Sequence, residues 1–107
     1  MIVENTQTQM RKGVLEYCIL SIIAKGEIYA SDIIAELKKA QLLVVEGTLY
    51  PLLSKLRREE LVDYEWQESE SGPPRKYYKL TPKGRTHLAT LNDYWKNLNR
   101  TLADFGN

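Results

Sequence analysis

The sequence predicts a single, mainly helical domain that carries one small β-hairpin. Apolar residues recur at helical spacing in four segments, whereas alternation of apolar and polar residues is confined to the region between residues 62 and 80. The segment ESGPP at 70–74 interrupts that region and favours a turn. At 107 residues, the chain has the length of one domain with a modest core.

The first two helices are predicted from their apolar spacing. The polar residues 1–9 show no periodicity and are expected to form a flexible N-terminal arm. From Met10 to Lys25, apolar residues recur at spacings of three and four, which predicts an amphipathic helix that stops at Gly26. A second helix is expected over 31–40, with Ser31 as its cap. Its predicted buried face consists of Ile33, Ile34 and Leu37.

A third helix is predicted after a short link. Residues 41–45 are too few for a helix and favour an extended segment. Because Pro51 lacks an amide hydrogen and is tolerated only near a helix start, the helix should begin near Gly47 or Thr48, with Thr48 as a plausible cap. Its buried stripe consists of Leu49, Leu52, Leu53 and Leu56.

The alternating region predicts two antiparallel strands. Val62, Tyr64 and Trp66 should share one face of the first strand. On the returning strand, which follows the turn at 70–74, Tyr78 and Leu80 should pack inward. Opposite charges are expected to face each other across the hairpin: Asp63 and Glu65 on one strand, Arg75 and Lys79 on the other.

A long last helix is predicted from Pro82 to about Asp104. Thr81 supplies a capping hydroxyl, and proline is favoured at the first helical position. A heptad-like apolar seam follows: Leu88, Leu91, Trp95, Leu98 and Leu102. This seam exceeds what the core of a small domain can cover, so we expect a homodimer. The predicted organisation is an arm at 1–9, a domain at 10–81 and a dimerisation helix at 82–107.

The order of elements and the charge distribution together predict a DNA-binding domain. Three helices, a hairpin and a further helix form the winged helix-turn-helix arrangement, in which the third helix enters the major groove and the hairpin, the wing, contacts neighbouring backbone. Residues 75–84, RKYYKLTPKG, hold several basic side chains and no acid, although the net charge of the chain is only +1. A basic ribbon beside a helix suits a phosphate backbone, so double-stranded DNA is the expected partner.

The candidate DNA contacts lie off the leucine stripe and on the basic ribbon. Hydroxyl groups suit phosphates or base edges, and basic groups neutralise phosphates. The predicted contacts are Thr48, Tyr50, Ser54, Lys55 and Arg58 on the third helix, Arg75 and Lys76 in the wing, and Arg11 and Lys12 near the start of the first helix. The alternatives are solvated helix side chains, packing of Tyr50 against the first helix, and pairing of the wing cations with Asp63 and Glu65.

Three segments resemble the PadR-like transcriptional regulators in the same order. They are RKGVLEYCILSIIAKGEIYASDII at 11–34, GTLYPLLSKLRREELV at 47–62 and RKYYKLTPKG at 75–84, and the resemblance covers about residues 10–105. It implies a homodimeric repressor of a palindromic operator, in which an effector alters the angle between protomers. The chain departs from the family pattern at Ala30 with Ser31, at Pro73, and at Glu60, where a glycine commonly ends the recognition helix. The last departure predicts a different turn there.

Trp95 has two interpretations. It packs in the core or dimer interface, or paired Trp95 side chains line a pore for a small planar aromatic effector. The competing hypothesis for the whole chain is a winged-helix protein-interaction module without DNA binding, whose working surface is the acidic strand and hairpin.

Other function classes find little support. His87, the only histidine, has no carboxylate or thiol nearby in sequence, and there is no glycine-rich phosphate loop or metal-ligand pair, so we predict no enzyme, metal or cofactor. Cys18, the only cysteine, is expected to pack as a small apolar residue. No apolar run approaches the roughly 20 residues of a membrane span, and no secretory signal is evident, so the expected location is cytoplasmic.

Overall fold

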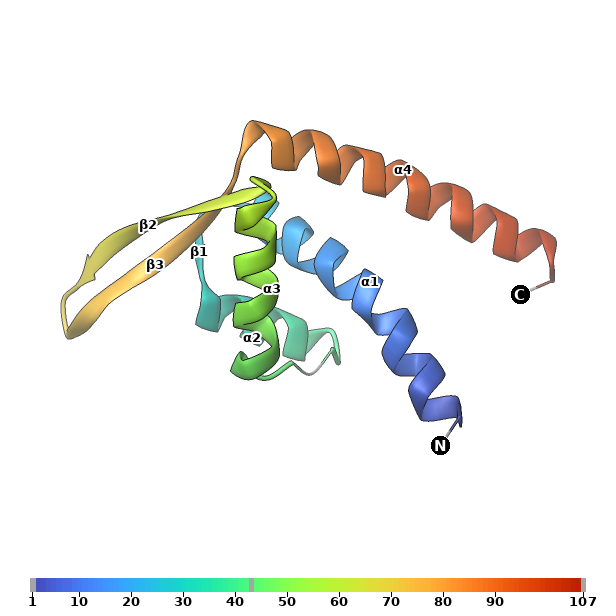
Figure 1. The fold of residues 1–107 in the computed structure, drawn as a ribbon, viewed down its shortest axis with the longest axis horizontal. Coiled ribbons are helices and arrows are strands. Elements are labelled where there is room, and N and C mark those ends of the chain that lie inside the picture. The colour runs from blue at the N-terminus through green and yellow to red at the C-terminus, as the bar shows by residue number, and fades with distance from the viewer. Residues whose placement is uncertain (1, 43, 107) are drawn as a thin grey trace.

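The computed structural model describes residues 2–42 and 44–106, with side chains from residue 5 onward. In this part of the chain four helices and three strands follow the order α1, β1, α2, α3, β2, β3, α4. The β2–β3 hairpin projects from one side of a helical cluster, and α4 extends from the other side (Figure 1). The bounds are α1 Ile2–Ala24, β1 Ile28–Tyr29, α2 Ala30–Lys39, α3 Glu46–Arg58, β2 Val62–Ser69, β3 Gly72–Leu80 and α4 Pro82–Asp104.

The core lies where α1, α2 and α3 meet the base of the hairpin. Each helix contributes the apolar stripe predicted for it, and Ile34 and Leu52 are only half-buried at the edge. The hairpin adds Val62, Tyr78 and Leu80, so the inward positions of Tyr78 and Leu80 are confirmed. The largest fully buried side chains are Ile19, Leu20, Ile23, Ile33, Leu37, Leu49, Leu53, Leu56 and Val62. This mainly helical winged-helix fold is the predicted one.

The sheet has the order β1-β3-β2 and is antiparallel throughout. The two-residue strand β1 was not predicted, because a pair of residues is too short to show alternation. The hairpin turn consists of residues 70–71, so the expected turn at 70–74 is wrong at its second half. Pro73 and Pro74 belong to β3 instead, beside a register irregularity in β2 and beyond the reach of β1. Proline is tolerated there because fewer ladder bonds require its missing hydrogen.

The helix starts differ from the predictions in three places. Helix α1 begins at Ile2, so residues 2–9 of the expected flexible arm are helical, and residue 1 lies outside the described residues. Polar side chains do not by themselves prevent a helix, and this segment contains neither proline nor glycine. Helix α2 is preceded by Tyr29 and not capped by Ser31, because pairing of β1 with β3 keeps Tyr29 extended. Helix α3 follows Val45, which replaces Thr48 as the N-cap and makes no side-chain capping bond.

Two helices end through a left-handed residue that is not glycine. Gln41 after α2 and Glu60 after α3 both have φ of 63°. After α3, the amide of Glu60 donates to Arg57 O at 2.9 Å, and the amide of Leu61 donates to Leu56 O at 3.0 Å, which is the Schellman pattern. The expectation that Glu60 imposes a different turn is therefore wrong. The residue adopts the conformation that glycine would adopt.

Helix α4 has the predicted start and the predicted end. The Thr81 hydroxyl accepts a hydrogen bond from the Gly84 amide at 2.9 Å, and Pro82 occupies the first turn. Gly84 lies so close to the end of α3 that a Cβ built on it would be 2.0 Å from Leu61 O. Farther along, α4 packs against α1, with Trp95 and Tyr17 ring centroids 5.9 Å apart.

Candidate nucleic-acid interface

The outward face of α3 carries the polar side chains that the leucine stripe predicts. Because Leu49, Leu53 and Leu56 are buried, the positions between them point away from the core. The exposed side chains on this face are Thr48, Tyr50, Ser54, Lys55, Arg57 and Arg58. Tyr50, 45% exposed, turns toward the wing, where it lines a hollow together with Trp66 and Lys76, and its predicted alternative contact with the first helix is not seen.

Two hollows lie side by side between α3 and the wing. The first, of about 410 Å³, is lined by Tyr29, Ala30, Ser31, Tyr50, Trp66, Pro74, Arg75, Lys76 and Tyr78. The second, of about 350 Å³, is lined by Leu53, Ser54, Arg57, Arg58, Tyr64, Lys76 and Tyr78. They share Lys76 and Tyr78, and we call the two together the helix–wing groove. No acidic residue is among these lining side chains.

The groove brings together several predicted residues and adds others. Tyr50, Ser54, Arg58, Arg75 and Lys76 were predicted contacts, and all five line it. Thr48 is exposed on α3, and Arg11 and Lys12 are exposed on α1, but none of these three lines the groove.

Among the groove residues that were not predicted as DNA contacts are Arg57, Tyr64 and Trp66. The guanidinium of Arg57 lies over the Tyr64 ring, with Cζ 4.4 Å from the ring centroid. The Nζ of Lys76 lies 4.5 Å from the centroid of the same ring and 5.2 Å from that of Trp66. Strand alternation already placed both rings on one face, and the register Trp66↔Lys76 adds Lys76 to it. What alternation could not give was the distance from this face to α3.

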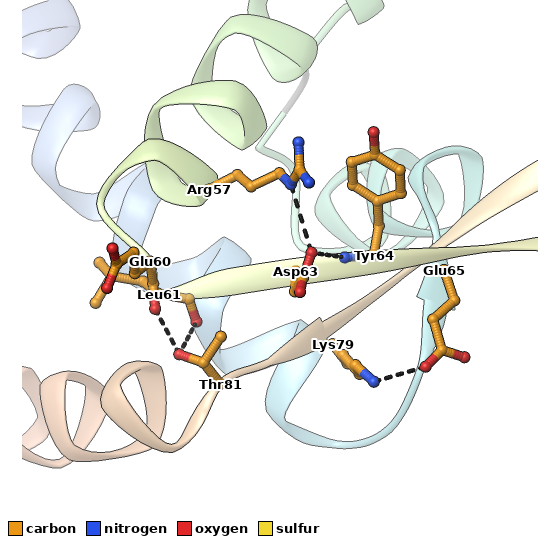
Figure 2. Close-up of polar contacts among 8 residues, drawn as sticks. All are labelled: Arg57, Glu60, Leu61, Asp63, Tyr64, Glu65, Lys79 and Thr81. Carbon is orange, nitrogen blue, oxygen red and sulfur yellow. Dashed lines mark hydrogen bonds and ion pairs between the residues drawn. The ribbon is translucent and has the colours of Figure 1, made fainter.

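Asp63 holds Arg57 from the side of β2. Arg57 Nε donates to Asp63 Oδ1 at 3.4 Å, and the same oxygen accepts the Tyr64 amide at 2.8 Å (Figure 2). The bond from the Tyr64 amide lowers the pKa of Asp63 most, and the bond from Arg57 also lowers it. Asp63 therefore stays ionised and fixes one edge of the guanidinium.

Lys55 is held differently from Arg57. Its ammonium group donates to Glu16 of α1, and this hydrogen bond is the main cause that raises the pKa of Lys55. The side chain was predicted to contact DNA, but it does not line the helix–wing groove. Its charge is balanced by a carboxylate of its own chain.

The other face of the wing is also internally paired. Lys79 Nζ lies 2.7 Å from Glu65 Oε1, which confirms the expected ion pair of Lys79, and this hydrogen bond raises the pKa of Lys79. Arg75 was expected to face an acid, but its strand partner is Gln67 and its guanidinium lies 5.0 Å from the Tyr29 ring centroid. In Figure 2, Arg57 and Tyr64 lie on one side of β2 and the Glu65–Lys79 pair on the other.

The region around Trp95 is a helix contact within the chain. Trp95 is half-buried against Tyr17, whose hydroxyl donates to Asn92 Oδ1. Along the seam Leu88, Leu91 and Leu98 are half-buried, whereas Leu102 is 43% exposed. Packing of Trp95 within the protein is thus seen.

The remaining reactive side chains form no metal-binding cluster in the described residues. His87 is exposed on α4, and no cluster of three metal-ligating side chains occurs in this part of the chain. Cys18 is a free, half-buried thiol against the core, and its burial raises its pKa. Among the described residues no helix is both long and apolar enough to span a membrane.

The fold places the chain in the class of winged-helix proteins, with a cationic groove between its third helix and its wing. The family follows from sequence: the profile of the transcriptional regulator PadR-like family matches residues 19–90. The chain therefore belongs to the PadR-like family of transcriptional regulators. Because members of this family are regulators, the prediction that the chain is not an enzyme is confirmed.

Three known proteins illustrate the similarity. A PadR-like transcription factor from Bacteroides fragilis is 57% identical, with a TM-score of 0.82 over 94% of this chain and 98% of that chain. A transcriptional regulator from Mycobacterium tuberculosis is 31% identical over 80 residues, which are 75% of this chain and 74% of that protein. Bacillus subtilis PadR, in a complex with operator DNA, is 30% identical, with a TM-score of 0.67 over 73% of this chain and 46% of that chain.

Proposed function

We propose that the chain binds double-stranded operator DNA, with α3 in the major groove and the wing on the adjacent backbone. The observation that carries this proposal is the helix–wing groove, whose lining includes Arg57, Arg58, Arg75 and Lys76 without an acidic residue. Phosphates attract such a lining, and the side-chain hydroxyls of Tyr50 and Ser54 suit the carbonyl and amino groups on base edges. The operator complex of the Bacillus subtilis relative supports the same partner.

The direct test is duplex binding as a function of salt. At low salt, addition of the protein should increase the fluorescence anisotropy of a fluorescein-labelled duplex of random sequence. The affinity should fall steeply as the salt concentration rises, because binding releases counterions. The double variant Arg58→Gln/Lys76→Gln should lose most of this binding. Lys38→Gln/Lys39→Gln, which removes two exposed charges of α2, is the matched control. No salt-sensitive binding by the intact protein would favour the protein-interaction module instead.

The proposed assembly is a homodimer built on α4. Leu102 continues the α4 seam while remaining partly exposed in the single chain, and a second copy can cover it. Two α3 helices would then meet successive major grooves about 34 Å apart, so a palindromic operator is expected. This assigns residues 10–81 to DNA binding and residues 82–107 to dimerisation.

A pair of neighbouring substitutions tests this assembly. Leu102→Glu should produce a folded monomer, because Leu102 contributes little to the core of its own chain. Thr101→Glu adds the same charge one position away, where the hydroxyl bonds only Asn97 O of its own helix. Sedimentation should give a monomer for the first variant and a dimer for the second. Dimers in both would overturn the α4 interface.

Repression and effector control complete the proposal. A repressor that occupies a palindromic operator releases it when a ligand changes the separation of the two α3 helices. We propose a small planar aromatic effector that stacks on Trp95 at the dimer interface. In a Trp66→Phe variant, such compounds should quench the fluorescence of Trp95 alone. Absence of quenching and of any effect on DNA binding would remove the effector from the proposal.

A further inference from the structure

Two cations from different elements converge on one aromatic ring in the helix–wing groove. Arg57 approaches Tyr64 from α3, with Cζ 4.4 Å from the ring centroid, and Lys76 approaches it from β3, with Nζ 4.5 Å away. The two cationic atoms are therefore no more than about 9 Å apart, the sum of those distances. Like charges repel only weakly at this separation in water, so an attraction to one ring is enough to hold both, and both line the second hollow of the groove.

The Tyr64 ring supplies that attraction without cancelling charge. The face of an aromatic ring attracts a cation through its quadrupole, whereas a carboxylate attracts it and also neutralises it. Lys55 and Lys79 are held by carboxylates, Glu16 and Glu65 respectively. Lys76 is held by rings alone among its described contacts, so its charge remains available to an anion.

Arg57 also keeps donors available. Asp63 accepts a hydrogen bond from Nε of the guanidinium, at 3.4 Å. The two Nη groups have no hydrogen-bond acceptor among the described residues, and the side chain lines the second hollow of the groove beside Ser54 and Arg58. A guanidinium fixed at one edge and stacked on a ring presents its remaining N–H groups in one direction.

We propose that Tyr64 is a positioning residue that holds Arg57 and Lys76 ready to clamp one phosphate of the DNA backbone in the helix–wing groove. The inference rests on the proposed DNA-binding function. The inference adds a particular phosphate site to that function. It also separates the cations of the chain according to the groups that hold them. The two cations stacked on the Tyr64 ring, Arg57 and Lys76, bind the backbone, although Arg57 also pairs with Asp63. Lys55 and Lys79, whose described contacts are with carboxylates alone, stabilise the fold.

Substitutions of the ring separate positioning from charge. With the random-sequence duplex, Tyr64→Phe keeps the ring and should bind as the wild type does. Tyr64→Leu removes the ring and should weaken binding about three- to tenfold, while the slope of affinity against salt stays unchanged because no charge is lost. Arg57→Gln and Lys76→Gln should each reduce that slope, and the two together by about 0.9, the share of one phosphate. Lys79→Gln, a charge on the opposite face, should leave it unchanged.

A double-mutant cycle distinguishes positioning from a general structural role. In the background Arg57→Gln/Lys76→Gln, the change Tyr64→Leu should have no further effect on DNA affinity, because no cation remains to be positioned. A ring that only supports the fold would weaken binding equally in both backgrounds, and that result would overturn the proposal. Tyr64→Met gives the same comparison if Tyr64→Leu does not fold.

The outcome also separates this inference from the function on which it rests. Steep salt-dependent binding by the wild type together with an additive cycle, or unchanged slopes for Arg57→Gln and Lys76→Gln, would overturn the phosphate clamp alone. Absence of DNA binding by the wild type would overturn both proposals.

Discussion

The two ends of α3 are held in different ways. At the C-terminal end, Glu60 turns left-handed and the Thr81 hydroxyl donates to Glu60 O at 2.6 Å, with Leu61 O a second acceptor at 3.2 Å (Figure 2). The Thr81 amide also donates to Leu61 O at 3.1 Å. At the N-terminal end, Val45 is 70% exposed and makes no side-chain cap. One end of the helix is joined to α4, and the other is open.

This difference identifies the C-terminal end of α3 as the part that sets the orientation of the helix. Because the end of α3 and the start of α4 share hydrogen bonds and a close backbone crossing at Gly84, the two helices should move as one unit. We call the contact of Glu60 and Leu61 with Thr81 and Gly84 the α3–α4 joint. If α4 carries the proposed dimer contact, the joint fixes the orientation of α3 in the dimer. Substitutions that break or loosen the joint therefore test whether it holds the C-terminal end of α3.

The largest effect is expected from Gly84→Ala. A Cβ at this position would lie 2.0 Å from Leu61 O, which is backbone and cannot move as a side chain does. We expect the free energy of unfolding to fall by about 3 kcal/mol, at the upper end for overpacking, as measured by urea denaturation. Gly47→Ala is the control, since its Cβ would meet nothing within 4 Å. Equal stability of the two variants would contradict the close crossing.

Thr81→Val tests the hydrogen bonds of the same joint. The substitution keeps the shape but removes the acceptor for the Gly84 amide and the donor to Glu60 O. We expect a loss of about 1–2 kcal/mol in the free energy of unfolding, as for a lost helix cap. Thr90→Val is the matched control, because the Thr90 hydroxyl bonds only Thr86 O of its own helix. A comparable loss of stability in the control would mean that the hydrogen bonds of the joint contribute no more than a bond within one helix.

Much of the fold could be predicted because each major element has a strong local cause. The Thr81–Pro82 pair fixed the start of α4, and the leucine stripe fixed which side of α3 faces the core. The predictions failed where a distant contact decides the local structure. Tyr29 stays extended because it pairs with Tyr77, which lies far along the chain. No pattern near Ser31 could reveal that partner.

The types of residue in the candidate site could be predicted from the sequence, but their positions relative to one another could not. Residue types predicted Arg58 and Lys76 as DNA contacts, and both line the groove. They also predicted Lys55, because a lysine on an exposed face looks the same whether or not a carboxylate lies opposite. The partner of Lys55, Glu16, is 39 residues away and belongs to another helix. Only the position of Glu16 beside α3 in the folded chain distinguishes this lysine from Lys76 of the groove.

Glu60→Gly should strengthen the joint. A left-handed conformation costs an ordinary residue about 1–2 kcal/mol, and glycine avoids this cost but loses more entropy on folding. We expect a net gain of about 0.5–1 kcal/mol in the free energy of unfolding, with the backbone bond to Thr81 retained. Glu59→Gly, at φ of −82°, should instead destabilise the protein. Thermal melting that shows a loss for Glu60→Gly would argue against the left-handed turn.

The smallest effect is expected in the last turn of α3, where Lys55 meets Glu16. For Glu16→Gln we expect a loss below about 1 kcal/mol at neutral pH, since both side chains are partly exposed. The pair raises the pKa of Lys55, so its contribution is fully present below the unfolded pKa and is lost as pH rises through the higher folded pKa. The difference in stability between wild type and variant should therefore be constant from pH 7 to about 10, and shrink above it.

The stability difference between wild type and Glu16→Gln should also shrink in concentrated salt, as for any exposed pair. Glu36→Gln, which removes a pair within α2 alone, should change less. A Glu16→Gln effect that concentrated salt leaves intact would mean that Glu16 supports α3 through packing and not through charge.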